Sequence, residues 1–124
     1  MKKIAAAAEA EAVANKWPVT IAIVDDGGNL LWLQRLDGVA PISASIAPSK
    51  ARTAALGQRE TKIYEDVINN GRYSFLSAPN IDGLLEGGVP IMANGDCVGA
   101  VGVSGVKSNE DAQIAKAGIA ALGL

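Results

Sequence analysis

The chain has 124 residues, of which 49% are hydrophobic and 19% charged, and its net charge is −2. This length suits a single domain over residues 1–124 with a buried core, and the apolar content excludes a disordered chain. The acidic balance, without interleaved basic and aromatic residues, argues against nucleic acid as a partner. No stretch approaches the roughly 20 apolar residues of a membrane span, so we expect no membrane partner either.

The chain contains one cysteine and no histidine. A single cysteine forms no internal disulfide, so nothing implies an oxidising compartment and we expect a cytoplasmic protein. The N-terminal run has the basic start of a secretion signal, but Glu9 and Glu11 interrupt its apolar part. Without histidine, any chemistry must use Lys, Arg, carboxylates, Tyr, Ser or Cys.

The first half of the chain predicts a helix and a hairpin. Ala, Glu and Lys favour helix over Lys2–Asn15, and Trp17-Pro18 closes it. Two apolar runs, 19–24 and 30–36, flank a Gly-Gly turn and predict a hairpin. Because both alternating faces of the first run are apolar, we expect helices on both faces of the sheet.

The middle of the chain predicts two helices and a loop. One helix is expected from about Pro48 to Gly57, because proline is tolerated in a first turn and glycine ends helices. A second is expected over Lys62–Asn69. The region Tyr73–Gly88 has too many Pro, Gly and Asn residues for regular structure, so it is the expected functional loop.

A second hairpin is centred on Asn94-Gly95, between two apolar runs. Gly99, Gly102 and Gly105 leave its second strand bare of side chains, which predicts the close approach of a helix, another backbone or a ligand. Their GxxGxxG spacing, without a βαβ unit, excludes a dinucleotide-binding fingerprint.

The last helix is expected to begin with Ser108 as its N-cap and Asp111 at position N3, and to end at Gly123. The order is therefore helix, hairpin, helices, loop, hairpin, helix. That order predicts an α+β fold with an antiparallel sheet of four or five strands and helices packed against it.

Several motifs in this order resemble the GlcG/HbpS-like family, which includes the haem-binding protein HbpS and the C-terminal domain of PduO-type corrinoid adenosyltransferases. The motifs are IAIVDDGGNLLWLQRLDG, SKARTAA, GGVPI, GDCVGAVGVSG and EDAQIAKAGIAAL. The resemblance implies a profilin-like fold, a five-stranded antiparallel sheet flanked by helices in α/β/α layers, and a homo-oligomer. Some members bind haem or act beside corrinoid enzymes, so the resemblance makes haem and a corrinoid the candidate cofactors. The histidine that the PduO domain is thought to use as axial ligand matches no position here, which leaves Tyr, Met, Cys or Lys.

The candidate ligand-binding residues are Lys50, Arg52, Glu86, Gly87 and Gly88. Lys50 and Arg52 belong to a family motif and point about 200° apart on a helix, so one of them would face a pocket and bind a carboxylate or propionate. The alternative for both is a solvated face or a subunit salt bridge. Glu86 would meet Lys50 or Arg52 as an acid/base or ion pair, or be a plain loop carboxylate.

Other residues have simpler explanations. Turns account for Asp26 and Asp37, and no cluster has metal-ligand spacing, so we expect no metal site. Tyr64, Tyr73 and Phe75 either line an apolar pocket or dock the loop on the core.

Three functions follow as hypotheses. The first is a small oligomeric protein that binds a small organic ligand, with a tetrapyrrole the most specific candidate, accessory to a catabolic pathway. The second is a cofactor-free enzyme acting on a small hydroxy- or oxo-acid, in which Lys50 or Arg52 holds the carboxylate and Glu86 moves a proton. The third is a structural accessory protein that stabilises a partner enzyme. The fold alone does not choose among them.

Overall fold

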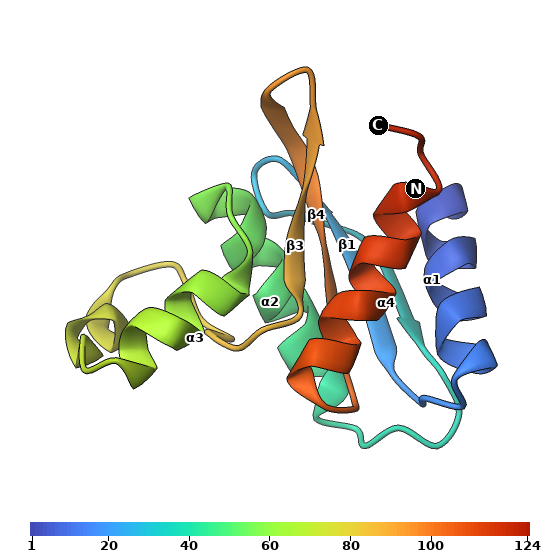
Figure 1. Ribbon diagram of the computed structural model, residues 1–124, viewed down its shortest axis with the longest axis horizontal. Helices are drawn as coiled ribbons and strands as arrows, with labels where there is room; N and C mark the ends of the chain where they lie inside the picture. The colour runs from blue at the N-terminus through green and yellow to red at the C-terminus, as the bar shows by residue number, and fades with distance from the viewer.

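A computed structural model describes all 124 residues and shows one antiparallel sheet between two layers of helices (Figure 1). The elements are α1 (Lys2–Ala14), β1 (Thr20–Asp25), β2 (Leu30–Arg35), α2 (Ser43–Gly57), α3 (Thr61–Asn69), the 3-10 helix η1 (Tyr73–Ser77), β3 (Gly88–Ala93), β4 (Asp96–Ser104) and α4 (Ser108–Ala120). The strand order is β2-β1-β4-β3, so the two hairpins pair through β1 and β4 at the centre of the sheet. The α+β class with helices on both faces is confirmed.

The sheet has four strands, so the five-stranded sheet that the resemblance implied is wrong. The segment between α3 and β3 forms η1 and an irregular loop. Its backbone has positive φ at Asn80, Gly83 and Gly87, and a chain that turns in this way does not run as an extended strand.

One face of the sheet packs against α1 and α4, which lie side by side (Figure 1). Here branched side chains of the central strands meet apolar residues of both helices. The buried residues of this layer are Ile4, Ala5, Ala8, Ala12, Val19, Ile21, Ile23, Val89, Ile91, Val101, Val103, Ile114 and Ala115. This is the larger of the two apolar clusters, and it carries most of the hydrophobic stabilisation.

The other face packs against α2 through very small residues, with Ala47 and Ala51 lying over Ala22 and Ala100 of the sheet. A Cβ atom placed on Gly102 would collide with the Ala47 carbonyl oxygen and the Ala51 nitrogen. The helix backbone therefore lies directly on β4. The predicted close approach is confirmed: a helix makes it at Gly102, whereas Gly99 and Gly105 lie against the backbone of Val24 and Pro18.

Helix α2 begins at Ser43, five residues before the predicted start at Pro48. The Ser43 hydroxyl is buried and lies 2.7 Å from the Thr20 hydroxyl of β1, which ties the first turn to the sheet. Packing of this turn outweighs the helix hydrogen bond that Pro48 removes. At the other end Gly57 is the last helical residue, and Gln58 takes the left-handed conformation with φ 56°.

The start of α4 also differs from the prediction. Lys107 is the N-cap and Glu110 is at N3, where its carboxylate accepts the Lys107 N–H at 3.3 Å. Ser108 and Asp111 therefore each lie one position later than predicted. The reason is that the Asp111 carboxylate turns back to accept the Val106 N–H at 3.1 Å.

Candidate functional site

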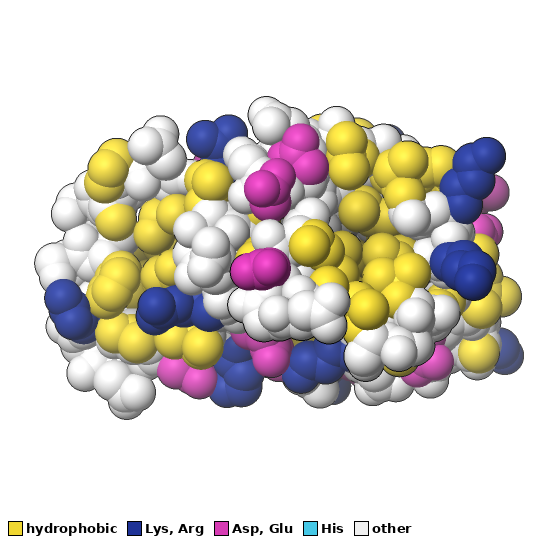
Figure 2. Space-filling view, turned by 90° about the horizontal axis from the view of Figure 1, so that it is seen from above, with side chains coloured by type: hydrophobic (Ala, Val, Ile, Leu, Met, Phe, Trp, Pro, Cys, Tyr) yellow, Lys and Arg dark blue, Asp and Glu magenta, His cyan; other side chains and the backbone are white.

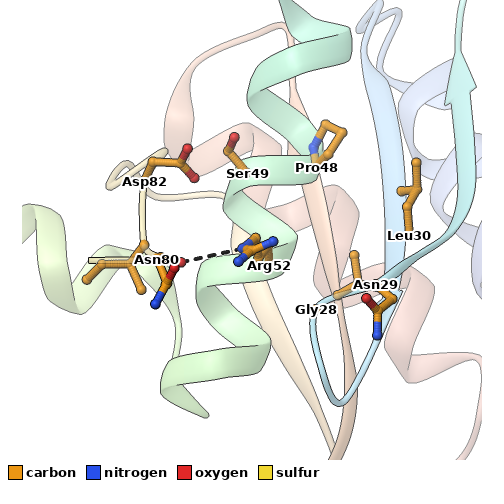
Figure 3. Close-up of a pocket in the computed structure, with 10 residues that line it drawn as sticks. Gly28, Asn29, Leu30, Pro48, Ser49, Arg52, Asn80 and Asp82 are labelled. Atoms are coloured by element: carbon orange, nitrogen blue, oxygen red, sulfur yellow. Dashed lines mark hydrogen bonds between the residues drawn. The ribbon is translucent and has the colours of Figure 1, made fainter. Parts of the chain in front are cut away.

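An open cleft of about 480 Å³ lies where α2 faces the β1–β2 turn on one side and the loop after η1 on the other (Figure 3). Its walls combine polar side chains with a few apolar ones. The lining residues are Val24, Gly28, Asn29, Leu30, Pro48, Ser49, Arg52, Asn80, Ile81 and Asp82. Three separate segments thus contribute to the cleft.

Helix α2 contributes Ser49 and Arg52, which lie three positions apart and so share one helix face. Arg52 is exposed, and its Nε donates to the Asn80 carbonyl oxygen at 3.4 Å. All three ion pairs of the protein involve other residues, so no carboxylate lies within 4.0 Å of the Arg52 guanidinium. The charge of Arg52 is therefore available to an anion in the cleft.

The loop after η1 forms one wall of the cleft, here called the loop wall. It is held in place by Thr53, which follows Arg52 in the sequence and is fully buried. The Thr53 hydroxyl donates to the Asp82 carbonyl oxygen at 2.5 Å and accepts the Asp82 N–H at 3.0 Å. The Asp82 carboxylate itself makes no hydrogen bond or ion pair within the protein. Figure 3 shows it on the side of the loop that faces Ser49.

The turn between β1 and β2 forms the opposite wall of the cleft. It is held by Asp25, whose Oδ1 accepts the N–H groups of Gly27 and Asn29 at 3.0 and 2.9 Å. The Asn29 N–H is the main reason that the pKa of the Asp25 carboxyl lies below its usual range. Gly28 has φ +80°, and a Cβ atom there would lie 3.0 Å from Cγ of Arg52. Glycine at this position thus leaves room for the Arg52 side chain.

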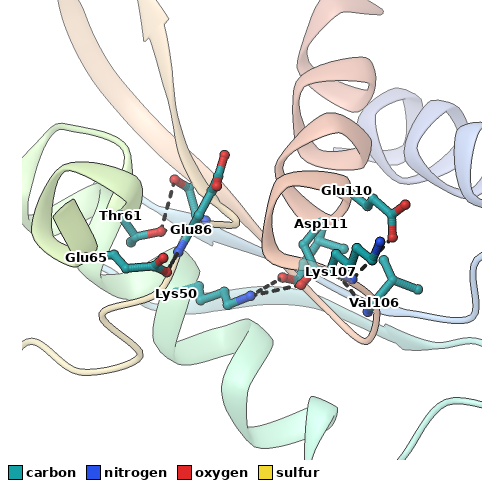
Figure 4. A network of polar contacts seen from close by, with 10 residues as sticks. Lys50, Thr61, Glu65, Glu86, Val106, Lys107, Glu110 and Asp111 are labelled. Carbon is teal, nitrogen blue, oxygen red and sulfur yellow. Dashed lines mark hydrogen bonds and ion pairs between the residues drawn. The ribbon is translucent and has the colours of Figure 1, made fainter. Parts of the chain in front are cut away.

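Lys50 does not line the cleft. Its side chain reaches from α2 towards Asp111 of α4 (Figure 4). It is 1% exposed, and its Nζ lies 3.1 Å from Oδ2 of Asp111 and donates to the Val103 carbonyl oxygen at 2.9 Å. Burial raises the pKa of the Asp111 carboxyl, while the Lys50 ammonium opposes the shift. The opposite orientation of Lys50 and Arg52 is confirmed.

Glu86, Gly87 and Gly88 gather near Lys50 rather than at the cleft. The Glu86 N–H donates to Oε1 of Glu65 at 2.8 Å (Figure 4), and the Glu86 carboxylate pairs with neither Lys50 nor Arg52. A Cβ atom on Gly87 would lie 2.7 Å from Nζ of Lys50, and one on Gly88 would collide with the Lys50 carbonyl oxygen. The two glycines therefore let the chain cover the buried lysine.

Of the five candidate residues, the structure brings only Arg52 into the cleft. Ser49, Asp82 and the two asparagines of the cleft had not been singled out. The spacing of Ser49 and Arg52 was a usable signal, since residues three apart share a helix face. Asp82 lies within the region expected to be the functional loop, but nothing local in the sequence distinguishes it.

A second hollow of about 370 Å³ lies on the other side of the same loop, against α3. It shares Ile81 and Asp82 with the cleft and is otherwise mostly apolar. Beside α3, the rings of Tyr64 and Phe75 meet edge to face at 5.7 Å, so these aromatic residues dock η1 on α3.

Figure 2 shows apolar, acidic and basic side chains intermixed over one face of the molecule.

No group of three or more Cys, Asp or Glu side chains gathers in a way that would hold a metal ion. None of the helices combines the length and the hydropathy that crossing a bilayer requires.

Comparison with known proteins gives the relationship of this chain. The model of the haem-degrading, HbpS-like protein family matches residues 1–120. The chain belongs to this family. It is 57% identical over 101 residues to protein GlcG of Escherichia coli K12, an alignment that covers 82% of this chain and 75% of GlcG.

Solved structures agree with the fold. The protein ORFY of Klebsiella pneumoniae superposes with a TM-score of 0.91 at 29% identity, covering 98% of this chain and 86% of ORFY. The PduOC protein in its complex with haem superposes with a TM-score of 0.87 at 27% identity, covering 97% of this chain and 89% of PduOC. The family relationship and the shared fold are therefore confirmed.

Proposed function

We propose that this protein binds a small organic ligand in the cleft and that a carboxylate of the ligand pairs with Arg52. The observation that carries the proposal is the Arg52 guanidinium, which lines the cleft without a carboxylate partner. Its planar fork of N–H donors is suited to a two-point grip on a carboxylate. The relationship to a protein that was solved with haem supports a ligand-binding role.

Haem fits this cleft only in part. Arg52 suits a propionate, and Val24, Leu30 and Ile81 offer apolar contacts. No Cys, Met or Tyr lines the cleft, and the chain has no histidine, so the cleft holds none of the usual side-chain ligands of haem iron. The proposal therefore rests on the carboxylate and involves no bond to iron. Cobalamin, whose ring side chains are amides rather than carboxylates, tests whether a corrinoid binds through other contacts.

Titrations of the purified protein test the proposal. The ligands are hemin, metal-free protoporphyrin IX, cobalamin and a set of small carboxylic acids, followed by absorption or by amide chemical shifts. We expect saturable binding of at least one carboxylate that shifts the amide signals of the cleft. Arg52→Ala should weaken it about tenfold to a hundredfold, the usual range for a hydrogen-bonded charge.

Arg59→Ala is the matched control, because the Arg59 guanidinium lies over the Tyr64 ring at 5.9 Å, outside the cleft. It should leave the affinity unchanged. The proposal is wrong if no carboxylate binds, or if the Arg52 and Arg59 variants bind equally well.

We also propose that the protein is a homo-oligomer in the cytoplasm. Strand β2 lies at the edge of the sheet and exposes Leu31 and Leu33, each about half accessible to solvent. An apolar edge strand of this kind is usually covered. The thiol of Cys97 has no disulfide partner, as is usual in the cytoplasm. Light scattering should give a mass above 12.6 kDa, and Leu33→Lys should lower it towards that value.

A further inference from the structure

We infer that the ligand carries a hydrogen-bond donor, a hydroxyl or an ammonium group, beside the carboxylate that Arg52 binds, and that Asp82 accepts from this donor. The ligand class is then a hydroxy acid or an amino acid, rather than an oxo acid or an unsubstituted carboxylic acid. The inference rests on the proposed function, because it names a second group on the same ligand.

The cleft holds two opposite charges that do not neutralise each other. Arg52 comes from α2 and Asp82 from the loop, and no nitrogen of the one lies within 4.0 Å of an oxygen of the other. Neither side chain pairs with any other charged group. A ligand with an anionic end and a donor complements both walls at once.

The chemistry of Asp82 sets the choice of donor. An ionised carboxylate only accepts hydrogen bonds, so it binds a hydroxyl or an ammonium group and gives nothing to a keto oxygen, which also only accepts. A ligand with a carboxylate alone meets Asp82 as a like charge. Ser49 lines the cleft opposite Asp82 (Figure 3). Its hydroxyl both donates and accepts, so it adds a partner for a hydroxyl or an ammonium group of the ligand.

The position of Asp82 is fixed before any ligand arrives. Its main-chain N–H and carbonyl oxygen both bond to the buried Thr53 hydroxyl, one residue from Arg52. The two charged residues of the cleft are therefore anchored to the same turn of α2. Such preorganisation reduces the cost of ordering the loop on binding. The hydrogen bond to Asp82 can then distinguish ligands that carry a donor from those that do not.

Four acids with the same three-carbon skeleton test the inference: propionate, pyruvate, lactate and free alanine. They share the carboxylate and differ at the second carbon, which bears hydrogen, a keto oxygen, a hydroxyl and an ammonium group. Amide chemical-shift titration gives each dissociation constant. We expect lactate or alanine to bind about tenfold more tightly than propionate and pyruvate, the effect of one hydrogen bond to a charged acceptor.

Asp82→Ala should act with opposite signs on the two groups of ligands. Lactate and alanine should lose their advantage, while propionate and pyruvate should bind slightly more tightly because a repelling charge is gone. Asp82→Asn keeps an acceptor but removes the charge, so it should weaken alanine more than lactate. The control is Asp66→Ala, since Asp66 pairs with Lys62 on an exposed face outside the cleft.

The outcomes separate the two proposals. Equal affinity for all four acids, with loss of binding in Arg52→Ala, overturns the inference and leaves the proposed function standing. The same holds if Asp82→Ala shifts all four affinities in one direction. If none of the acids binds, the inference is wrong, and the tetrapyrrole titrations then decide the proposed function on their own.

Discussion

The ammonium of Lys50 and the carboxylate of Asp111 lie 3.1 Å apart, although the two residues are 61 positions apart in the sequence. Lys50 belongs to α2 on one face of the sheet and Asp111 to α4 on the other, and both side chains are almost fully buried. One ion pair thus connects the two helical layers at the end of the sheet where β3 begins (Figure 4).

Removal of one partner from this pair should destabilise the protein strongly. Lys50→Met leaves the Asp111 carboxylate buried without its counter-charge, which typically costs about 3–5 kcal/mol. Urea unfolding of the variant measures the loss. Lys62→Met is the control, because the Lys62–Asp66 pair is half exposed, and its unfolding midpoint should hardly move. The double variant Lys50→Met/Asp111→Asn should lose less than the sum of its single variants, and strict additivity would contradict the coupling.

Burial of Asp111 should also leave a signature in the pH dependence of stability. The pKa of this carboxyl is raised above 3.8, so the folded state binds the proton more tightly than the unfolded state. The stability that Asp111 contributes is then fully present below 3.8 and falls as pH rises through the raised pKa. The difference in unfolding free energy between the parent and Asp111→Asn should therefore be smaller at neutral pH than below 3.8.

Asp25 provides a control of opposite sign for that experiment. Its pKa is lowered, chiefly by the Asn29 N–H, so its contribution is present above 3.8 and is lost on acidification. The difference between the parent and Asp25→Asn should accordingly grow towards neutral pH. Parallel pH profiles for the two variants would contradict both assignments.

Gly102→Ala should force α2 away from the sheet. The added Cβ would overlap backbone atoms of Ala47 and Ala51, which move only with the whole helix, and overpacking of this kind costs about 1–3 kcal/mol. Thermal unfolding measures the loss. Gly27→Ala is the matched change, since its nearest neighbour is the movable Asn29 amide at 3.1 Å and its φ is not positive. Equal destabilisation by Gly102→Ala and Gly27→Ala would contradict the close contact between α2 and β4.

Thr53→Val should loosen the loop wall of the cleft. Valine keeps the shape of threonine but removes the hydroxyl that bonds twice to the Asp82 main chain, at a cost of about 1 kcal/mol. Hydrogen exchange at the Asp82 amide should accelerate, and the affinity for cleft ligands should fall. Thr53→Ser keeps the hydroxyl and should restore slow exchange. Unchanged exchange in Thr53→Val would show that other contacts hold the loop.

The elements that were predicted correctly have local signals. Asn94 and Gly95 both have positive φ, as the hairpin turn requires, and the apolar residues of β1 are buried on both faces of the sheet. Alternation and turn chemistry are properties of a few consecutive residues, so they can be read without knowledge of the fold.

The features that were missed depend on residues far apart in the chain. The first turn of α2 forms around Ser43 because Thr20 of the sheet binds its hydroxyl, and this contact outweighs the local signal of Pro48. Asp111 was interpreted as a helix-start charge, since nothing near it in the sequence reveals Lys50 as a partner. Asp82 enters the cleft for the same reason, because Thr53 of a distant helix holds it there.

The alanine and glycine contact between α2 and β4 has a consequence for how this cleft can change. Main-chain atoms of α2 lie against Gly102 of β4, so the backbone sets the distance between helix and strand, and a larger side chain on the inner side of α2 would push the helix away from the sheet. The outer side of the same helix carries Ser49 and Arg52 and is free of that constraint. New ligand preferences would therefore arise from substitution of Ser49, Arg52 and Asp82, while the position of the helix on the sheet stays the same.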